Sequence, residues 1–243
     1  APLAEGALFV HAGVQGDLFM TDKGLTDQAL RESLLDAAMA HVAFDGWTEA
    51  AFRAAAADAG VSVARARVTC PRGALDLAVD YHKRGDAAMV AGLAGLNHLR
   101  FRDRVARAVR LRLETADREL VRRGAALFAL PQRAATGAAL IWGTADAIWT
   151  ALGDTSEDVN WYTKRATLAA VYSATVLYWL GDDSEGQADT WDFLDRRIAG
   201  VMRFETAKAR LRENRLFTGL MRPLSGIRRP GPPPEGLPGR VRS

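Results

Sequence analysis

The 243-residue sequence predicts an all-α protein: a helical bundle with a helix-turn-helix segment near its N-terminus and an amphipathic helix near its C-terminus. Strand signals are nearly absent, because alanine, leucine and arginine dominate and apolar residues recur at intervals of three and four. Prolines gather at the C-terminal end, where they cannot interrupt the bundle. Apolar residues make up 49% of the chain and charged residues 25%, which is typical of a globular protein.

Local signals place the helix ends. Thr26, Thr48 and Ser62 each precede an apolar-periodic segment and suit the N-cap position. Gly46 and Gly60 are typical of the turns that follow helices. We therefore expect helices at about residues 26–44, 48–60, 62–68, 73–96 with a kink at Gly85, 98–116, on to Leu130 before a stop at Pro131, 136–152, from 160, from 190, and 215–222.

The longest apolar run, residues 166–180, is too short for the roughly 20 residues of a membrane span. It is apolar all round, so we expect the helix that begins near Asn160 to be enclosed by other helices.

Charge divides the chain unevenly. From Arg196 onward there are twelve basic residues against three glutamates, so the basic character belongs to the tail. The first residues fit neither a secretory signal nor an arginine-rich transit peptide, and we expect Met20 to be the true start and residues 1–19 a translated leader. The predicted organisation is a disordered extension 1–25, a helix-turn-helix segment 26–72, a larger helical domain 73–205, a linker and amphipathic helix 206–227, and a disordered basic tail 228–243.

No constellation for catalysis or metal binding is evident. His11, His41, His82 and His98 fall at no ligand spacing, and Cys70 is alone. We predict no catalytic residue, no metal site and no cofactor.

The segment "RESLLDAAMAHVAFDGWTEAAFRAAAADAGVS" resembles the start of the TetR regulator family. That resemblance implies a helix-turn-helix module followed by a helical ligand-binding domain. DNA binding is nevertheless disfavoured, because residues 27–73 hold five arginines against six acidic residues and lack a basic footprint. Arg65 and Arg67 are the only candidate groove readers.

A second resemblance is more specific. The segment "GDTSEDVNWYTKRATLAAVYSATVLYWLGDDSEGQADTWDFLDRRIAGVMRF" at residues 153–204 resembles the Coq-nine family of ubiquinone-biosynthesis accessory proteins, as does "LLDAAMAHVAFDGWTEAA". The resemblance covers about residues 27–225. It implies a TetR-like fold, a pocket for an isoprenoid lipid or quinone intermediate, partnership with a di-iron demethoxy-quinone hydroxylase, and contact with a membrane surface.

Three sets of candidate residues follow. The lipid would lie among the helices of residues 98–180, although the same side chains could simply fill the core. The hydroxylase would bind at the start of the helix near Asn160, unless Trp161 is tucked in as a cap. The final helix would contact the membrane, or else dock on the protein itself. The lipid set is Leu113, Leu140, Trp142, Leu168, Val171, Tyr172 and Val176; the partner set is Asp146, Ile148, Trp149, Asp158, Trp161 and Tyr162; the membrane set is Arg215, Leu216, Phe217, Leu220, Met221, Arg222 and Leu224.

The sequence thus favours a non-catalytic lipid presenter in quinone synthesis. The alternative is a TetR-type ligand-responsive regulator. By analogy with TetR proteins we expect a homodimer. We also expect a bacterial cytoplasmic location at the inner membrane, with the mitochondrial matrix disfavoured.

Overall fold

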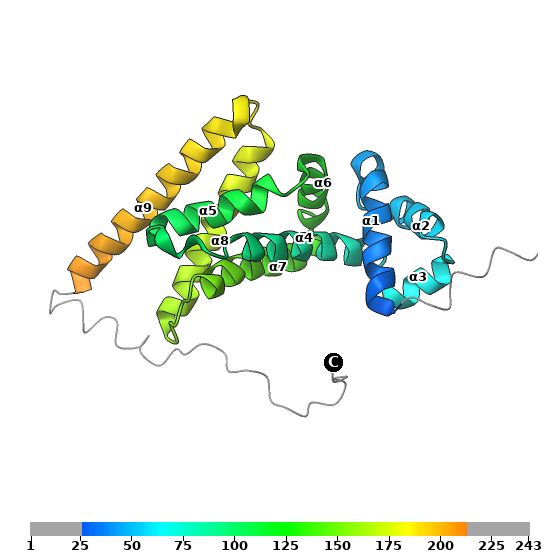
Figure 1. The fold of residues 1–243 in the computed structure, drawn as a ribbon, viewed down its shortest axis with the longest axis horizontal. Coiled ribbons are helices and arrows are strands. Elements are labelled where there is room, and N and C mark those ends of the chain that lie inside the picture. The colour runs from blue at the N-terminus through cyan, green and yellow to red at the C-terminus, as the bar shows by residue number, and fades with distance from the viewer. Residues whose placement is uncertain (1–25, 213–243) are drawn as a thin grey trace, which may run out of the picture. The chain divides into compact units, whose positions relative to one another are not determined.

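The computed structural model describes residues 26–212, and its helices follow one another in the order of Figure 1. Every regular element in this range is a helix, which confirms the predicted fold class. None of these helices is both long and apolar enough to cross a membrane. The elements are α1 Asp27–Asp45, α2 Glu49–Asp58, α3 Val63–Thr69, α4 Ala74–Gly92, η1 Leu96–His98, α5 Phe101–Glu114, α6 Arg118–Phe128, α7 Pro131–Ala151, α8 Val159–Leu180, η2 Glu185–Gln187 and α9 Ala188–Arg212.

The chain forms two compact units, residues 1–78 and 79–243, of which 26–78 and 79–212 are described. The division falls inside α4, whereas the sequence predicts a boundary between residues 72 and 73. A helix that continues from one unit into the next gives no composition change at the boundary, so the sequence carries no signal for it.

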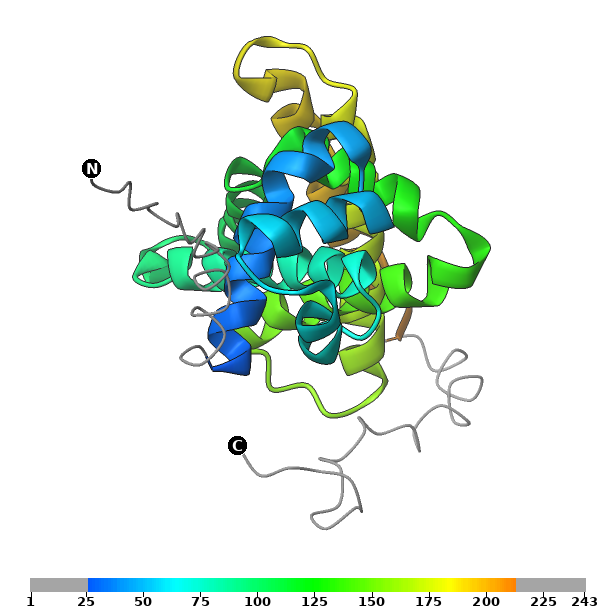
Figure 2. The ribbon, with the colours of Figure 1, turned by 90° about the vertical axis from the view of Figure 1, so that its right-hand side faces the viewer.

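Unit 1 consists of α1, α2 and α3, the blue and cyan helices of Figure 2. The side chains of Thr26, Thr48 and Ser62 each accept a hydrogen bond from the backbone N–H three residues on, which confirms the three predicted N-caps. The predicted inner face of α1 is buried: Leu30, Leu34, Leu35, Ala38 and Val42.

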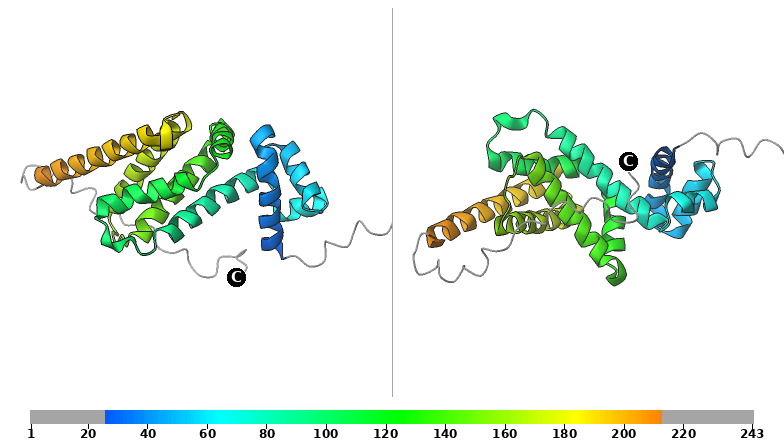
Figure 3. Two further views of the ribbon diagram at one scale, coloured as in Figure 1. Left: turned by 45° about the horizontal axis from the view of Figure 1, so that its top comes forward. Right: turned by 90° about the horizontal axis from the view of Figure 1, so that it is seen from below.

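Unit 2 packs α5, α7, α8 and α9 around a common apolar core that includes Met89, Leu113, Ile148, Leu168 and Leu194. Helix α8 packs against both α7 and α9 (Figure 3). The prediction that α8 is enclosed is wrong. Its face with Ala166, Ala170 and Leu177 is exposed, because α7 and α9 cover only the opposite side. 

The sequence predicts that one helix stops at Pro131 and that the next begins near Thr136. In the structure Pro131 occupies the first position of α7, which therefore begins five residues earlier than predicted. Proline suits this position because its fixed φ is helical and its missing N–H has no partner there in any helix.

The predicted kink at Gly85 is not a break, since α4 is continuous through it. A β-carbon added at Gly85 would lie 2.6 Å from the guanidinium carbon of Arg112. Glycine therefore makes room for an arginine that is 2% exposed and donates to Asp86 Oδ1 over 2.7 Å. Thr144 Oγ1 donates to the same oxygen over 2.9 Å and lies 2.8 Å from His82 Nε2. This network fixes α4, α5 and α7 together inside unit 2.

Acidification should destabilise the fold through His82. Burial lowers the pKa of His82 to about 4; the Asp86 carboxylate opposes this shift and Arg112 adds to it. Unfolded histidine has a pKa near 6.5, so between pH 6.5 and 4 the unfolded chain binds a proton that the folded chain refuses. Stability should therefore fall by about 3 kcal/mol as the pH drops through this window.

Urea unfolding followed by circular dichroism at pH 7 and pH 4.5 measures this loss. The His82→Gln variant keeps a donor for Thr144 but cannot be protonated, so it should lose markedly less stability over the same interval. Equal losses in the two proteins would contradict the assignment.

Candidate functional site

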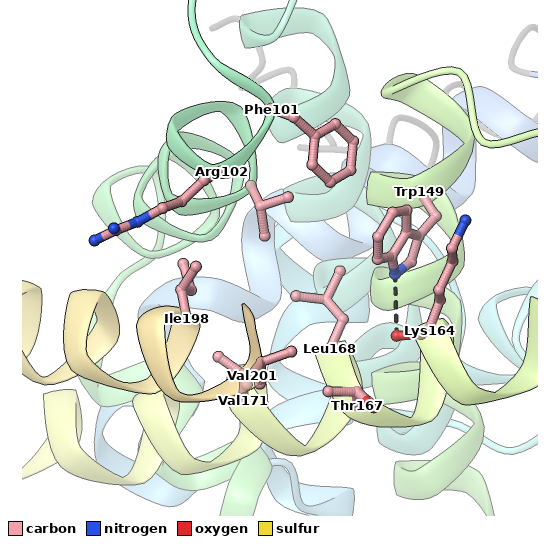
Figure 4. Close-up of a pocket in the computed structure, with 10 residues that line it drawn as sticks. Phe101, Arg102, Trp149, Lys164, Thr167, Leu168, Val171, Ile198 and Val201 are labelled. Atoms are coloured by element: carbon pink, nitrogen blue, oxygen red, sulfur yellow. Dashed lines mark hydrogen bonds between the residues drawn. The ribbon is translucent and has the colours of Figure 1, made fainter. Parts of the chain in front are cut away.

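An apolar pocket of about 280 Å³ lies in unit 2 between α5, α7, α8 and α9 (Figure 4). Its volume is at the lower end of the range for small-molecule sites, so it fits part of a long ligand rather than a whole one. The lining residues are Phe101, Arg102, Val105, Trp149, Lys164, Thr167, Leu168, Val171, Ile198 and Val201.

The charged groups of the pocket lining are turned away, and its indole N–H is already bonded. The charged ends of Arg102 and Lys164 point away from its centre in Figure 4. Trp149 Nε1 donates to the Lys164 carbonyl over 3.1 Å. The rings of Phe101 and Trp149 lie 5.4 Å apart, centroid to centroid, on the upper side of the pocket in that view. The interior therefore offers contact with hydrocarbon and no free hydrogen-bonding group from Trp149.

Of the seven residues predicted to line a lipid pocket, Leu168 and Val171 do so. Leu113, Leu140 and Tyr172 are buried instead, and burial raises the pKa of Tyr172 to about 12. The remaining two, Val176 and Trp142, also lie outside the pocket lining; Val176 packs against the core from a half-buried position. For these five residues, contact with a lipid stays a prediction.

Trp142 belongs to a group of rings that we call the aromatic patch: Trp142, Trp161 and Tyr162. The Trp161 and Tyr162 centroids lie 4.9 Å apart, edge to face, and Trp142 lies 5.9 Å from Trp161 and 6.5 Å from Tyr162. All three side chains are half-buried. Edge-to-face geometry and partial exposure are common where aromatic residues anchor a protein partner. The sequence assigns Trp142 to the lipid set instead, because the sequence does not show which face of α7 meets the start of α8.

The other predicted partner residues do not lie on one surface. Ile148 is fully buried and cannot meet a partner, so its assignment is wrong. Asp158 is exposed and accepts from the Asn160 N–H over 2.9 Å as the cap of α8. Trp149 is a wall of the pocket, and Asp146 is half-exposed beside the patch.

A charged cluster joins the pocket and the patch: Asp146, Asp154, Lys164 and Arg165. Arg165 is 2% exposed, donates to Asp146 Oδ1 over 2.5 Å and to Asp154 Oδ2 over 2.9 Å, and lies 4.1 Å above the Trp161 ring. Burial by itself would raise the pKa of Asp154. Hydrogen bonds from Lys164, Arg165 and Ser156 outweigh that effect and hold the pKa well below its usual range.

An open groove runs along the exposed side of α8 and α9. Small residues such as Ala166, Ala170 and Gly200 form its floor, and Arg196, Arg197 and Arg203 border it. The predicted homodimer would place its contact on these last helices; the dimer stays a prediction.

The two candidate DNA-reading arginines are engaged within unit 1. Arg65 donates to Asp27 Oδ1 over 2.7 Å, and Arg67 is paired with Glu49 and stacks on the Phe52 ring at 5.0 Å. Hydrogen bonding from Arg67 lowers the pKa of Glu49. Base or phosphate contacts by either arginine would first have to break these pairs.

The predicted membrane residues 215–224, the N-terminal extension and the basic tail lie outside the described residues. Within residues 26–212, no three histidine, cysteine, aspartate or glutamate side chains come together in a way that could hold a metal ion.

Comparison with known proteins shows which family these features are similar to. Residues 134–205, which span most of α7, all of α8 and much of α9, match the COQ9 family model. The chain is 36% identical to the fruit fly Drosophila melanogaster protein named "Ubiquinone biosynthesis protein COQ9, mitochondrial", over 70% of this chain and 54% of that one. The rat and human proteins of the same name are 31% and 30% identical, each over 75% of this chain and over 62% and 61% of their own lengths. The chain thus spans a little over half of these relatives.

The fold also matches a solved structure. A TetR transcriptional regulator from Nitrosomonas europaea superposes with a TM-score of 0.58, over 70% of this chain and 96% of that chain. The sequence identity is 20%, so the likeness concerns the fold alone. The predicted TetR-like architecture is confirmed.

The expected location is wrong. A bacterial cytoplasmic site at the inner membrane was favoured over the mitochondrial matrix, yet the fly, rat and human relatives are all named mitochondrial. The expectation rested on the composition of the first residues alone, which does not outweigh relatedness along most of the chain.

The matched segment contains the aromatic patch, the charged cluster, and every pocket residue contributed by α7, α8 and α9. This chain is therefore a relative of the COQ9 proteins, built on a TetR-like fold.

Proposed function

We propose that this chain acts in ubiquinone biosynthesis as a non-catalytic, lipid-binding accessory protein. It binds an isoprenoid quinone intermediate in the apolar pocket and presents it to the demethoxy-quinone hydroxylase, which docks at the aromatic patch. The observation that carries the proposal is the position of Lys164, which lines the pocket beside Trp149 and also belongs to the charged cluster next to the patch.

The pocket chemistry favours the hydrocarbon part of such a ligand. Burying apolar carbon contributes about 0.8 kcal/mol per CH2 group. A quinone oxygen deep in the pocket would lose its water and find Trp149 Nε1 already bonded to the Lys164 carbonyl. The prenyl chain therefore enters the pocket, and the head group stays toward the rings of Phe101 and Trp149.

The same lining supports a role without bond chemistry. Its only hydroxyl belongs to Thr167, and the Lys164 ammonium is bound 2.8 Å from Asp154 Oδ1. A general base or nucleophile needs an adjacent activating group, and neither side chain has one in the pocket. In this proposal the hydroxylase supplies the chemistry and a membrane surface supplies the lipid.

Lipid binding is tested by extraction. Protein purified from cells that make ubiquinone should release an isoprenoid lipid into organic solvent, detected by mass spectrometry. Val201→Trp would occupy the space of about one five-carbon unit, worth about 4 kcal/mol, so recovery should fall at least about tenfold. Val68→Trp makes the same substitution at an exposed position of α3 and should change nothing. Empty wild-type protein, or equal recovery from both variants, would sink this part of the proposal.

Partner binding is tested at the patch. Trp161→Ala should weaken hydroxylase binding about tenfold or more in isothermal titration calorimetry, as expected for a central aromatic anchor. Phe44→Ala removes an aromatic ring that is 83% exposed in unit 1 and serves as the matched control. Far-ultraviolet circular dichroism must show unchanged helicity. If Trp161→Ala loses helicity instead, Trp161 packs for the fold and does not serve a partner.

A regulator with this fold would bind specific DNA, and we expect this chain not to. Mobility-shift assays on genomic fragments at moderate salt should show no specific retardation, because Arg65 and Arg67 are held by acidic residues of their own unit. A TetR repressor with its operator is the positive control. Retardation that survives competitor DNA would favour the regulator instead.

A further inference from the structure

Asp154 stands between the two proposed binding surfaces, and its contacts go to both. We propose that Asp154 is a positioning residue: one carboxylate that holds the wall of the pocket and the support of the aromatic patch in a single arrangement. This inference deepens the proposed function and, for its biological consequence, rests on it.

The first oxygen of Asp154 serves the pocket. Oδ1 accepts from Lys164 Nζ over 2.8 Å and from Ser156 Oγ over 2.8 Å. The Lys164 ammonium lies 5.2 Å above the ring of Trp149, and Trp149 Nε1 donates to the Lys164 carbonyl. The backbone of Asp154 also contacts Trp149, because the Asp154 N–H donates to the Trp149 carbonyl over 3.0 Å. Trp149 and Lys164 both line the pocket, and two contacts from Asp154 hold them: Oδ1 with the Lys164 ammonium, and the backbone N–H with the Trp149 carbonyl.

The second oxygen serves the patch. Oδ2 accepts from Arg165 Nη1 over 2.9 Å, and the same guanidinium lies 4.1 Å above the Trp161 ring. Arg165 Nη1 also donates to the Trp161 carbonyl over 3.3 Å. Arg165, which Asp154 holds, therefore supports the rotamer of Trp161. The Trp161 ring is the one that Trp142 and Tyr162 contact.

Burial makes the arrangement strict. The side chains of Asp154 and Arg165 are 2% and 3% exposed, so water cannot replace either partner. Removing the Asp154 carboxylate would leave the buried Arg165 guanidinium with the half-exposed Asp146 in place of two carboxylates, and losing a partner of a buried ion costs more than the pair is favourable. Lys164 and Arg165 are consecutive and point about 100° apart on α8. A single carboxylate can bind both cations only if one of its oxygens faces each of them, as in Asp154. Gly153, with a φ of 79°, makes the turn that places Asp154 between the two cations.

The test uses full-length protein labelled with 5-fluorotryptophan, with the ¹⁹F resonances of Trp149 and Trp161 assigned from single Trp→Phe variants. Asp154→Asn should shift both resonances. Lys164→Met should shift mainly the Trp149 signal, and Arg165→Lys mainly the Trp161 signal. Glu157→Gln alters an exposed carboxylate of the same turn and should shift neither. An Asp154→Asn protein in which either resonance stays in place would overturn the proposal.

A second measurement does not depend on the folding of Asp154→Asn. Lys164→Met and Arg165→Lys, combined, should change the urea midpoint by an amount that differs from the sum of the single effects, because both cations share one carboxylate. Additive effects would contradict a shared role.

Binding then separates this inference from the proposed function. With farnesol as the pocket probe and the purified hydroxylase as partner, Asp154→Asn should weaken both at least about fivefold, whereas Lys164→Met weakens mainly farnesol and Arg165→Lys mainly the hydroxylase. If wild-type protein binds neither probe, the proposed function fails while the fluorine result still decides the role of Asp154. If wild-type protein binds both and Asp154→Asn retains both, the inference fails and the proposed function stands.

Discussion

A buried arginine must find a carboxylate inside its own unit, and unit 2 meets this requirement twice. Arg112 is matched by Asp86 between α5 and α4, and Arg165 by Asp154 and Asp146 where α7 turns into α8. Taking such an ion out of water costs several kcal/mol, and only close, multiple hydrogen bonds offset it. The partner helices therefore cannot slide past each other without breaking a pair. These two arginines fix the relative register of four helices more strictly than the interchangeable apolar contacts around them.

The secondary structure was predictable where its cause is local. Thr26, Thr48 and Ser62 cap their helices with their own side chains, so each signal lies within four residues of its effect. Gly85 shows the opposite case. A glycine within a helix suggests a kink when only neighbours are considered, but its cause is Arg112, which is distant in sequence and adjacent in space. The exposed face of α8 was also unpredictable from the local sequence, because a run of apolar residues does not indicate which side of the helix the neighbouring helices cover.

The pocket was predictable as a class of site but only partly as a set of residues. Leu168 and Val171 are three apart and share a face of α8, whereas Tyr172 lies about 100° further round the helix and enters the core. A rotation of one residue likewise separates buried Ile148 from Trp149 at the pocket wall. The stripes of α5 and α9 that supply Phe101, Val105, Ile198 and Val201 were visible in the sequence. That they face a common space is a tertiary fact, since it depends on how α5 and α9 cross α8.

In unit 1, the arginines that a DNA-binding regulator could use are paired with carboxylates of the unit itself. Arg65 and Arg67 occupy α3, the position of a recognition helix, yet they bind Asp27 and Glu49 of their own unit. Each pair satisfies a guanidinium that would otherwise seek a phosphate, and it replaces an attraction for DNA by an interaction that stabilises the three-helix packing. In a unit whose charge is net acidic, no long-range field then draws nucleic acid toward it. The helices of unit 1 pack together, and the apolar pocket and the aromatic patch lie in unit 2.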